Sequence, residues 1–205
     1  MAELLSYALT NLSDVKESLG LASGDNSKNN LIIRKINQAT EMIEKYCGGR
    51  RFKATDYTGQ EYDSTNSDQL ILKQYPVNSF TILQYRDSVL NDNAWDTVNA
   101  DEYFVDTDSG VIDLLFVAVG KWNQYRATYN AGYDTIPADL AEACVTLACY
   151  LVDNAQSGTG VKSKQEGGRK IEYFDVNAQN GGSIFSQLNL DDTLDTYSKY
   201  PVQEK

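Results

Sequence analysis

The fold is decided by one stretch, YNAGYDTIPADL, which spans residues 129–140. Residues 125–130, which overlap the start of this stretch, alternate apolar and polar side chains, as a half-buried strand does. Gly132 permits a tight turn out of that strand. Pro137 fits the first turn of a helix, because the N–H that proline lacks has no helical partner there. The stretch therefore predicts that a strand ends near residue 130 and that a helix begins near residue 136.

Three segments of the chain show the helical period. The helix that follows Pro137 is predicted over 136–154 and is apolar on nearly all sides, so we expect it to be the most buried. A second helix is predicted over 27–47, capped by Ser27 and ended by two glycines, and a shorter one over 13–20, capped by Ser13. Together they predict a bundle of three main helices.

Between the second and third helices, residues 52–130 have the character of short strands separated by Asn, Asp, Ser and Gly. The segments richest in strand-forming residues are 70–72, 80–83, 103–105 and 111–114. Residues 106–110 predict a hairpin turn. They do not fit a calcium loop, because the glycine falls at position five rather than six and no Glu stands at position twelve. The predicted fold class is therefore α+β, a helical bundle with an antiparallel β insertion.

The remainder of the chain is predicted to be an appendage. Residues 1–155 form the predicted core, and residues 156–205 form a Gly-rich loop and a C-terminal docking arm, which has too few apolar residues to be a domain. One apolar run, residues 114–119, leaves two interpretations open. It is a strand buried on both faces, or it is a surface that another subunit covers.

The composition excludes several functions. The 205 residues include no histidine, which excludes Ser-His-Asp and Cys-His catalysis and any His-ligated metal. Three cysteines without CxxC spacing predict neither disulfides nor a metal cluster, and we expect no cofactor. The N-terminus does not resemble a signal peptide, and no apolar stretch reaches the length of a membrane span. The sequence therefore predicts a soluble protein of a reducing cytoplasm.

The net charge of −11 is unevenly distributed. Residues 1–54 hold 8 basic and 6 acidic side chains, net +2, and residues 156–205 hold 6 and 7, net −1. Residues 55–155 hold 4 basic and 16 acidic side chains, net −12. This acid excess argues against a surface that wraps DNA, since phosphate binding needs clustered cations.

Ten residues are candidates for contact with a partner. Arg50 and Arg51 follow the long helix, and we favour a structural role at its C-terminus over contact with an acidic partner. The basic loop, residues 162–170, has no helix end to stabilise, and contact with a partner (protein or nucleic acid) and the absence of such a contact are equally open. The arm contributes apolar and tyrosine side chains. The candidates are Arg50, Arg51, Lys162, Lys164, Arg169, Lys170, Leu190, Leu194, Tyr197 and Tyr200.

Two stretches resemble the head–tail connector proteins of tailed bacteriophages, the portal adaptors or head-completion proteins. The first runs from Leu12-Ser13-Asp14 through the helix that ends Tyr46-Cys47-Gly48-Gly49-Arg50-Arg51-Phe52, and the second is residues 129–140 with the Ala-rich helix behind them. The resemblance covers residues 10–55 and 120–155. Its motifs are structural, and it implies a protein without enzymatic activity.

The resemblance also implies a place in the virion. Such a protein is made in the host cytoplasm and forms a ring, dodecameric in this family, beneath the portal. It extends the DNA channel and docks the next tail-completion protein, the stopper. Residues 55–155 would then line or approach the channel, and DNA would pass without specific binding. The alternatives are a stopper or tail terminator and, more remotely, a metal-dependent hydrolase that uses clustered aspartates.

Overall fold

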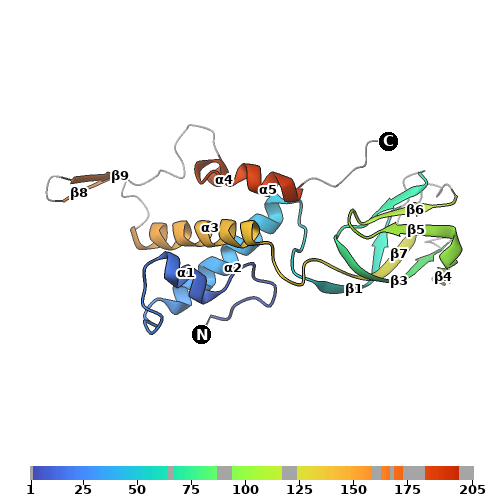
Figure 1. Ribbon diagram of the computed structural model, residues 1–205, viewed down its shortest axis with the longest axis horizontal. Helices are drawn as coiled ribbons and strands as arrows, with labels where there is room; N and C mark the ends of the chain where they lie inside the picture. Colours follow the sequence, from blue (N-terminus) through green and yellow to red (C-terminus); the bar gives the residue numbers. More distant parts are fainter. Residues whose placement is uncertain are drawn as a thin grey trace. The chain divides into compact units, whose positions relative to one another are not determined.

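The computed structural model describes residues 2–63, 67–86, 94–116, 124–157, 163–166, 169–172 and 183–198. The fold is mixed α/β with antiparallel sheets and several helices (Figure 1). It divides into a helical unit, Met1–Gly49 with Ile136–Lys199, and a sheet unit built mainly from Arg50–Thr135. The sheet unit is thus inserted between two parts of the helical unit, in the place where the sequence predicts a β-rich insertion over 52–130.

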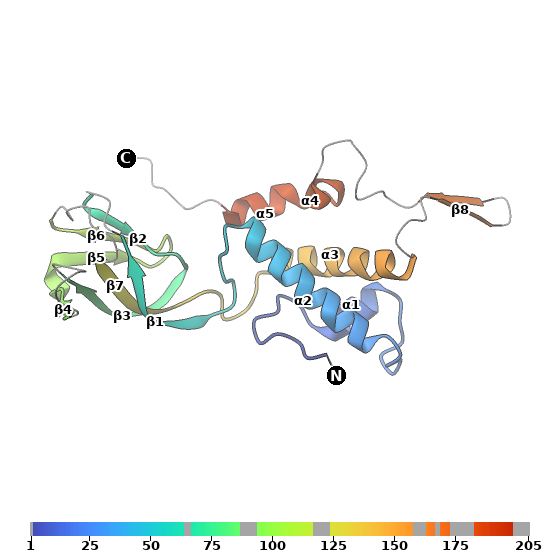
Figure 2. The same cartoon turned by 180° about the vertical axis from the view of Figure 1, so that it is seen from behind.

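The helical unit contains two long helices that pack against each other, a short N-terminal helix that packs against both, and two short helices near the C-terminus (Figure 2). Its elements are α1 (Leu12–Ser18), α2 (Asn29–Tyr46), α3 (Ala138–Ser157), α4 (Ile184–Gln187) and α5 (Asp191–Ser198), with a separate hairpin of β8 (Ser163–Glu166) and β9 (Arg169–Glu172). The α5 helix packs against both α2 and α3.

The apolar stripes that predict these helices form the core of the helical unit. On α2, Ile32, Ile36, Ala39 and Ile43 are fully buried. On α3, the buried residues follow the predicted spacing and include Leu140, Cys144, Leu147, Ala148 and Val152. The predicted helical period is therefore confirmed in both helices, and each stripe faces the other helix.

The two predicted N-caps are wrong. Asn11 caps α1, and its side-chain oxygen accepts a hydrogen bond from the Asp14 N–H at 3.0 Å. The Ser27 hydroxyl donates to Asp25 at 2.7 Å and does not cap α2. At α1 the Asn11 side chain takes the capping position, and before α2 the Ser27 hydroxyl is engaged by Asp25, so that no side chain caps α2. The predicted end of α2 is confirmed, because Gly48 and Gly49 both adopt a φ of 80°, which favours glycine.

The sheet unit consists of two antiparallel sheets that share one apolar core. Its strands are β1 (Thr55–Tyr62), β2 (Gln69–Ile71), β3 (Val77–Tyr85), β4 (Asp96–Thr97), β5 (Tyr103–Asp106), β6 (Val111–Leu114) and β7 (Tyr125–Ala131), with a short 3-10 helix η1 (Ala100–Glu102). The sheets have the orders β1-β7-β3-β4 and β2-β6-β5. Both contribute to the same buried cluster, to which Tyr62, Leu83, Tyr129, Leu70 and Ile112 belong.

The turn within residues 129–140 lies near the end of the sheet unit and pairs with its beginning. Gly132 adopts a φ of +114°, and the chain then runs beside residues 52–54. The Tyr133 N–H donates to the Phe52 carbonyl at 2.6 Å, and the Ala54 N–H donates to the Tyr133 carbonyl at 3.1 Å. A Cβ atom at position 132 would lie 2.7 Å from the Lys53 carbonyl carbon. Only glycine therefore fits this turn without strain.

The apolar run 114–119 is not a strand buried on both faces over the residues that the structure describes. Strand β6 ends at Leu114, which is buried, whereas Leu115 is 78% exposed and Phe116 is 38% exposed. Successive side chains of a strand point to opposite faces, so Leu114 enters the core and Leu115 faces outward. Residues 117–119 lie outside the described residues.

Candidate interaction surfaces

The sheet of β2, β6 and β5 has one face in the core and one face outside. Leu70, Ile112 and Val105 are paired in register and belong to or pack on the core. Their neighbours in sequence therefore occupy the opposite side. We name this side, with the adjoining Leu115, the outer sheet face. Its positions are Gln69, Ile71, Phe104, Asp106, Val111, Asp113 and Leu115.

The outer sheet face is unusually apolar for an exposed surface. Phe104 is 67% exposed and Ile71 is 46% exposed, in addition to Leu115. The described residues include five exposed large hydrophobic side chains, and four of them lie on or directly beside this three-stranded sheet. Contiguous exposed apolar side chains typically mark an interaction site. Figure 1 shows β6 and β5 side by side in this small sheet.

Acidic groups accompany these apolar side chains. Asp113 lies at the centre of the face and accepts a hydrogen bond from Gln69 at 2.7 Å. Asp106 closes the β5–β6 turn, where it accepts the Ser109 hydroxyl at 2.7 Å. The Ser109 hydroxyl and nearby backbone N–H groups hold the pKa of Asp106 below its usual range. The predicted hairpin turn over 106–110 is therefore confirmed.

Arg50 lies inside the sheet unit and is almost fully buried, with 5% of the residue exposed. Its Nε donates to the Tyr75 carbonyl at 3.1 Å, and the guanidinium lies 3.5 Å from the centre of the Tyr75 ring. The Arg51 N–H donates to the Gln74 side chain at 2.7 Å. Both residues thus join the start of the sheet unit to the segment before β3. These contacts lie within the sheet unit and not at the end of α2, where we expected them.

The last two helices are held on the helical unit by apolar and polar contacts. Leu194 is fully buried and Leu190 is 8% exposed, so their apolar area is already covered within the chain. The Tyr46 hydroxyl of α2 donates to Asp195 at 2.8 Å. This hydrogen bond, aided by burial, raises the pKa of Tyr46 to about 12.

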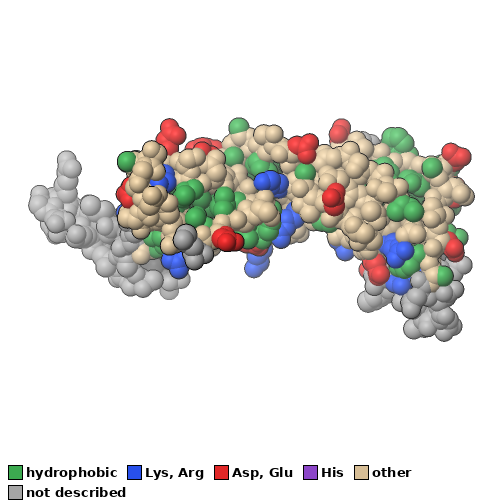
Figure 3. Space-filling model, turned by 90° about the horizontal axis from the view of Figure 1, so that it is seen from below, with side chains coloured by type: hydrophobic (Ala, Val, Ile, Leu, Met, Phe, Trp, Pro, Cys, Tyr) green, Lys and Arg blue, Asp and Glu red, His purple; other side chains and the backbone are tan. Residues whose placement is uncertain are grey.

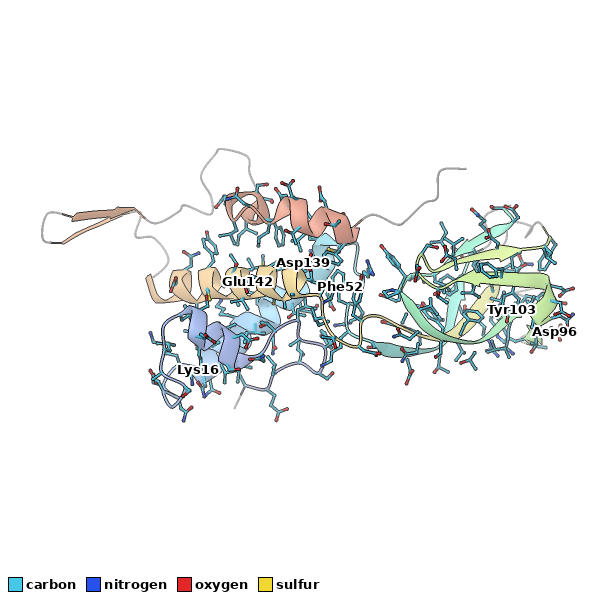
Figure 4. The ribbon with its side chains drawn as sticks, viewed as in Figure 1. Lys16, Phe52, Asp96, Tyr103, Asp139 and Glu142 are labelled. Carbon is cyan, nitrogen blue, oxygen red and sulfur yellow. The ribbon has the colours of Figure 1, made fainter. Side chains whose placement is uncertain are left out.

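Tyr197 extends the same attachment to the start of α3. Its hydroxyl donates to Asp139 at 2.7 Å, and Figure 4 shows Asp139 at the beginning of that helix. The predicted partner residues Leu190, Leu194 and Tyr197 are therefore brought together, but by contacts within their own chain. The sequence identifies the amphipathic stretch correctly and does not reveal which surface it covers.

The basic candidates lie on and beside the β8–β9 hairpin. Lys164 is in β8, and Arg169 and Lys170 are in β9; the two strands pair in the register Glu166 with Arg169. Lys162 and Tyr200 lie outside the described residues. The structure therefore places three of the four basic candidates on one antiparallel hairpin.

Charged side chains of both signs appear on the face drawn in Figure 3, with exposed apolar side chains between them. Within the described ranges, no three Cys, Asp or Glu side chains are grouped so that they could hold a metal ion. Of the helices that the structure describes, none has the length and apolar character needed to span a membrane.

Sequence reasoning singled out Leu115, as part of the apolar run 114–119 that another subunit could cover, but it missed Ile71 and Phe104. Three successive apolar residues, Tyr103, Phe104 and Val105, occupy one strand, and alternation requires one of them to face outward. That signal is present in the sequence. It becomes decisive only when the register shows that Tyr103 and Val105 face the core.

Comparison with known proteins identifies the family. The model of the head completion protein family matches residues 8–178. A chain from the neck of an empty gene transfer agent (GTA) particle, a structure computed with C6 symmetry, is similar at a TM-score of 0.57 and 15% identity, over 99% of this chain and 96% of that one. A chain from the virion of a native GTA particle has a TM-score of 0.52 and 16% identity, over 78% and 86%. A search of the curated proteins finds no match.

The chain belongs to the head completion protein family, whose model covers most of both units. This membership confirms the resemblance to phage head-completion proteins and identifies the chain as a structural protein of the virion. The similarity to the two particle structures extends across the helical and the sheet unit, and at 15–16% identity it shows a shared fold.

Proposed function

We propose that this chain is a connector subunit of the virion neck, which forms a ring, attaches to the portal and extends the DNA channel. The observation that carries the proposal is the match of the head completion family model to residues 8–178. The similarity to a neck chain over 99% of this chain supports the location. The lower end of the ring would dock the stopper protein. The ring is expected to be dodecameric, and the role is structural, without catalysis.

The acidic middle of the chain has a role in this proposal. Residues 55–155 carry a net charge of −12, and a ring multiplies the charge of each subunit. A negative passage repels phosphates, so DNA slides without binding. The described acids of the sheet unit that would contribute include Asp96, which Figure 4 shows at the β4 strand. A ring whose bore is basic or neutral would contradict this part of the proposal.

The docking arm also belongs to the proposal. We propose that residues 156–205 contact the portal or a neighbouring subunit, with the basic residues Lys162, Lys164, Arg169 and Lys170 in the contact. Support comes from the separate β8–β9 hairpin, which forms a two-stranded sheet of its own. The α5 helix fixes the other end of the arm through Leu194, which is fully buried.

Electron microscopy of the protein mixed with its portal tests the function. We expect rings seated on the portal, and a stable monomer that never joins the portal would refute the connector role. Binding to a preformed connector–portal complex, in place of the portal itself, would identify a stopper. The variant Lys164→Glu with Arg169→Glu tests the arm without exposing the area that α5 covers. We expect it to fold normally and to join the portal poorly.

A further inference from the structure

We propose that the outer sheet face binds the basic β8–β9 hairpin of a neighbouring copy of this chain. The inference rests on the proposed function in one respect, namely that several copies assemble. It goes further by naming the two surfaces that meet. The first surface is the apolar face that carries Ile71, Phe104 and Leu115, and the second is the hairpin of β8 (Ser163–Glu166) and β9 (Arg169–Glu172).

The exposed apolar area indicates that the outer sheet face is covered in the assembled particle. Phe104 and Leu115 expose 67% and 78% of their surface, and Ile71 exposes 46%. Asp113 lies on the central strand β6, opposite Gln69 of β2 and Phe104 of β5. The exposed apolar side chains therefore surround the Asp113 carboxylate. A monomer gains nothing from this arrangement, and its exposed apolar side chains would favour aggregation.

The charges of the face determine the kind of occupant. Asp113 and Asp106 lie on the face, and Glu102 lies beside Leu115, whose N–H donates to the Glu102 carbonyl at 2.9 Å. None of the three strands contains Lys or Arg. Two copies of this face cannot pair with each other, because acids would oppose acids. The occupant must therefore be apolar and basic, and the contact must join two different surfaces.

The β8–β9 hairpin fits this requirement. Residues 162–172 contain four cations and two acids, net +2, in a chain whose net charge is −11. They also contain Ile171 for the apolar part of the face. Among the described strands, β8 and β9 pair only with each other, and β2 and β5 are the edges of their sheet. A contact between two different surfaces, repeated from copy to copy, is the kind that closes a ring.

Photo-crosslinking from position 104 tests the contact. Phe104 is replaced by benzoylphenylalanine in the full chain, and equal amounts of isotopically light and heavy protein are assembled on the portal and irradiated. We expect cross-links between position 104 of one copy and residues 162–172 of another, with light and heavy partners mixed. Cross-links within one copy, to other residues or to the portal would each overturn the inference.

Charge exchange provides an independent test on the same assembly. Asp113→Lys is expected to lower the yield of copy-to-copy cross-links about tenfold, because like charges then face each other. Combining it with Lys164→Glu and Arg169→Glu is expected to restore most of the yield. Glu17→Lys is the matched control, since Glu17 is an exposed acid of α1 and lies outside the outer sheet face. An equal loss in the control, or no loss with Asp113→Lys, would overturn the inference.

The two proposals fail in distinguishable ways. If rings form on the portal but position 104 gives no cross-link to the hairpin, the proposed contact is wrong. The connector function is then still supported. Absence of rings under all conditions would refute the function itself, and the same micrographs report it.

Discussion

The Gly132→Ala substitution offers the sharpest test of how the beginning and the end of the sheet unit are held together. A side chain at a φ of +114° costs about 1–3 kcal/mol. The new Cβ atom would also lie 2.7 Å from the Lys53 carbonyl carbon and 2.8 Å from the Ala54 nitrogen, which are backbone atoms. The two segments must then separate, which weakens the hydrogen bonds from Tyr133 to Phe52 and from Ala54 to Tyr133.

Each of those hydrogen bonds contributes about 0.5–1.5 kcal/mol to the free energy of unfolding. Together with the strain, we expect Gly132→Ala to lower that free energy by about 2–6 kcal/mol. Urea titration followed by tryptophan fluorescence reports the unfolding of the sheet unit, because Trp95 and Trp122 both belong to it. Circular dichroism follows the helical unit in the same samples.

Gly24→Ala is the matched control. No atom lies within 4 Å of a Cβ built at Gly24, and its φ is outside the left-handed region. We expect this variant to be as stable as the wild type within about 0.5 kcal/mol. If Gly132→Ala changes stability no more than Gly24→Ala, the reasoning about the paired segments is refuted.

Three further predictions follow from buried or hydrogen-bonded side chains. Tyr129→Phe removes the hydroxyl that contacts Tyr62 at 2.7 Å and donates to a glutamine at 2.6 Å; we expect a loss of about 1–3 kcal/mol in urea titrations followed by fluorescence. Leu194→Ala leaves a cavity under α5, and we expect a loss of about 2–4 kcal/mol and faster proteolysis of the C-terminal helices, whereas unchanged proteolysis would contradict the buried position. The lowered pKa of Asp106 stabilises the fold above the ordinary carboxyl pKa, and that contribution is lost as the pH falls through the lowered value. Asp106→Ala is therefore expected to reduce the acid sensitivity of unfolding, measured by melting temperature against pH.

The elements predicted from the sequence are those whose side chains follow a single period. The stripe of Ile32, Ile36, Ala39 and Ile43 predicts α2 because one partner covers one face of that helix. The alternation after Tyr125 predicts β7 for the same reason. In both cases the local pattern and the tertiary contact agree, so a window of a dozen residues is enough.

Strand β1 could not be predicted in this way. Its sequence, TDYTGQEY, is polar and contains a glycine, which is unfavourable for a strand. It forms because β7 supplies a partner for its backbone, from Thr55 opposite Ala131 to Tyr62 opposite Tyr125. The pairing residues are far apart in the sequence, so no local window contains the signal.

The candidate surfaces also differ in whether local sequence or tertiary contacts determine them. Net charge by segment and the basic stretch around residue 164 can be read from the sequence. The burial of Leu194 and Arg50 depends on α2, α3 and Tyr75, which the chain brings close only on folding. Exposure of Phe104 and Leu115 likewise depends on the register of β5 and β6. The sequence thus indicates which types of residue could contact a partner, but not where the fold places them.

The paired segments 52–54 and 132–133 have a consequence for exchange of the sheet unit. The sheet unit begins and ends in two segments that lie side by side, joined by an isolated bridge between Lys53 and Tyr133, so its two ends are adjacent. A unit with adjacent ends can be removed, exchanged or replaced by a short turn without moving its host. Exchange of the sheet unit would therefore leave the buried stripes of α2 and α3 in place, whereas the outer sheet face would be lost with the unit.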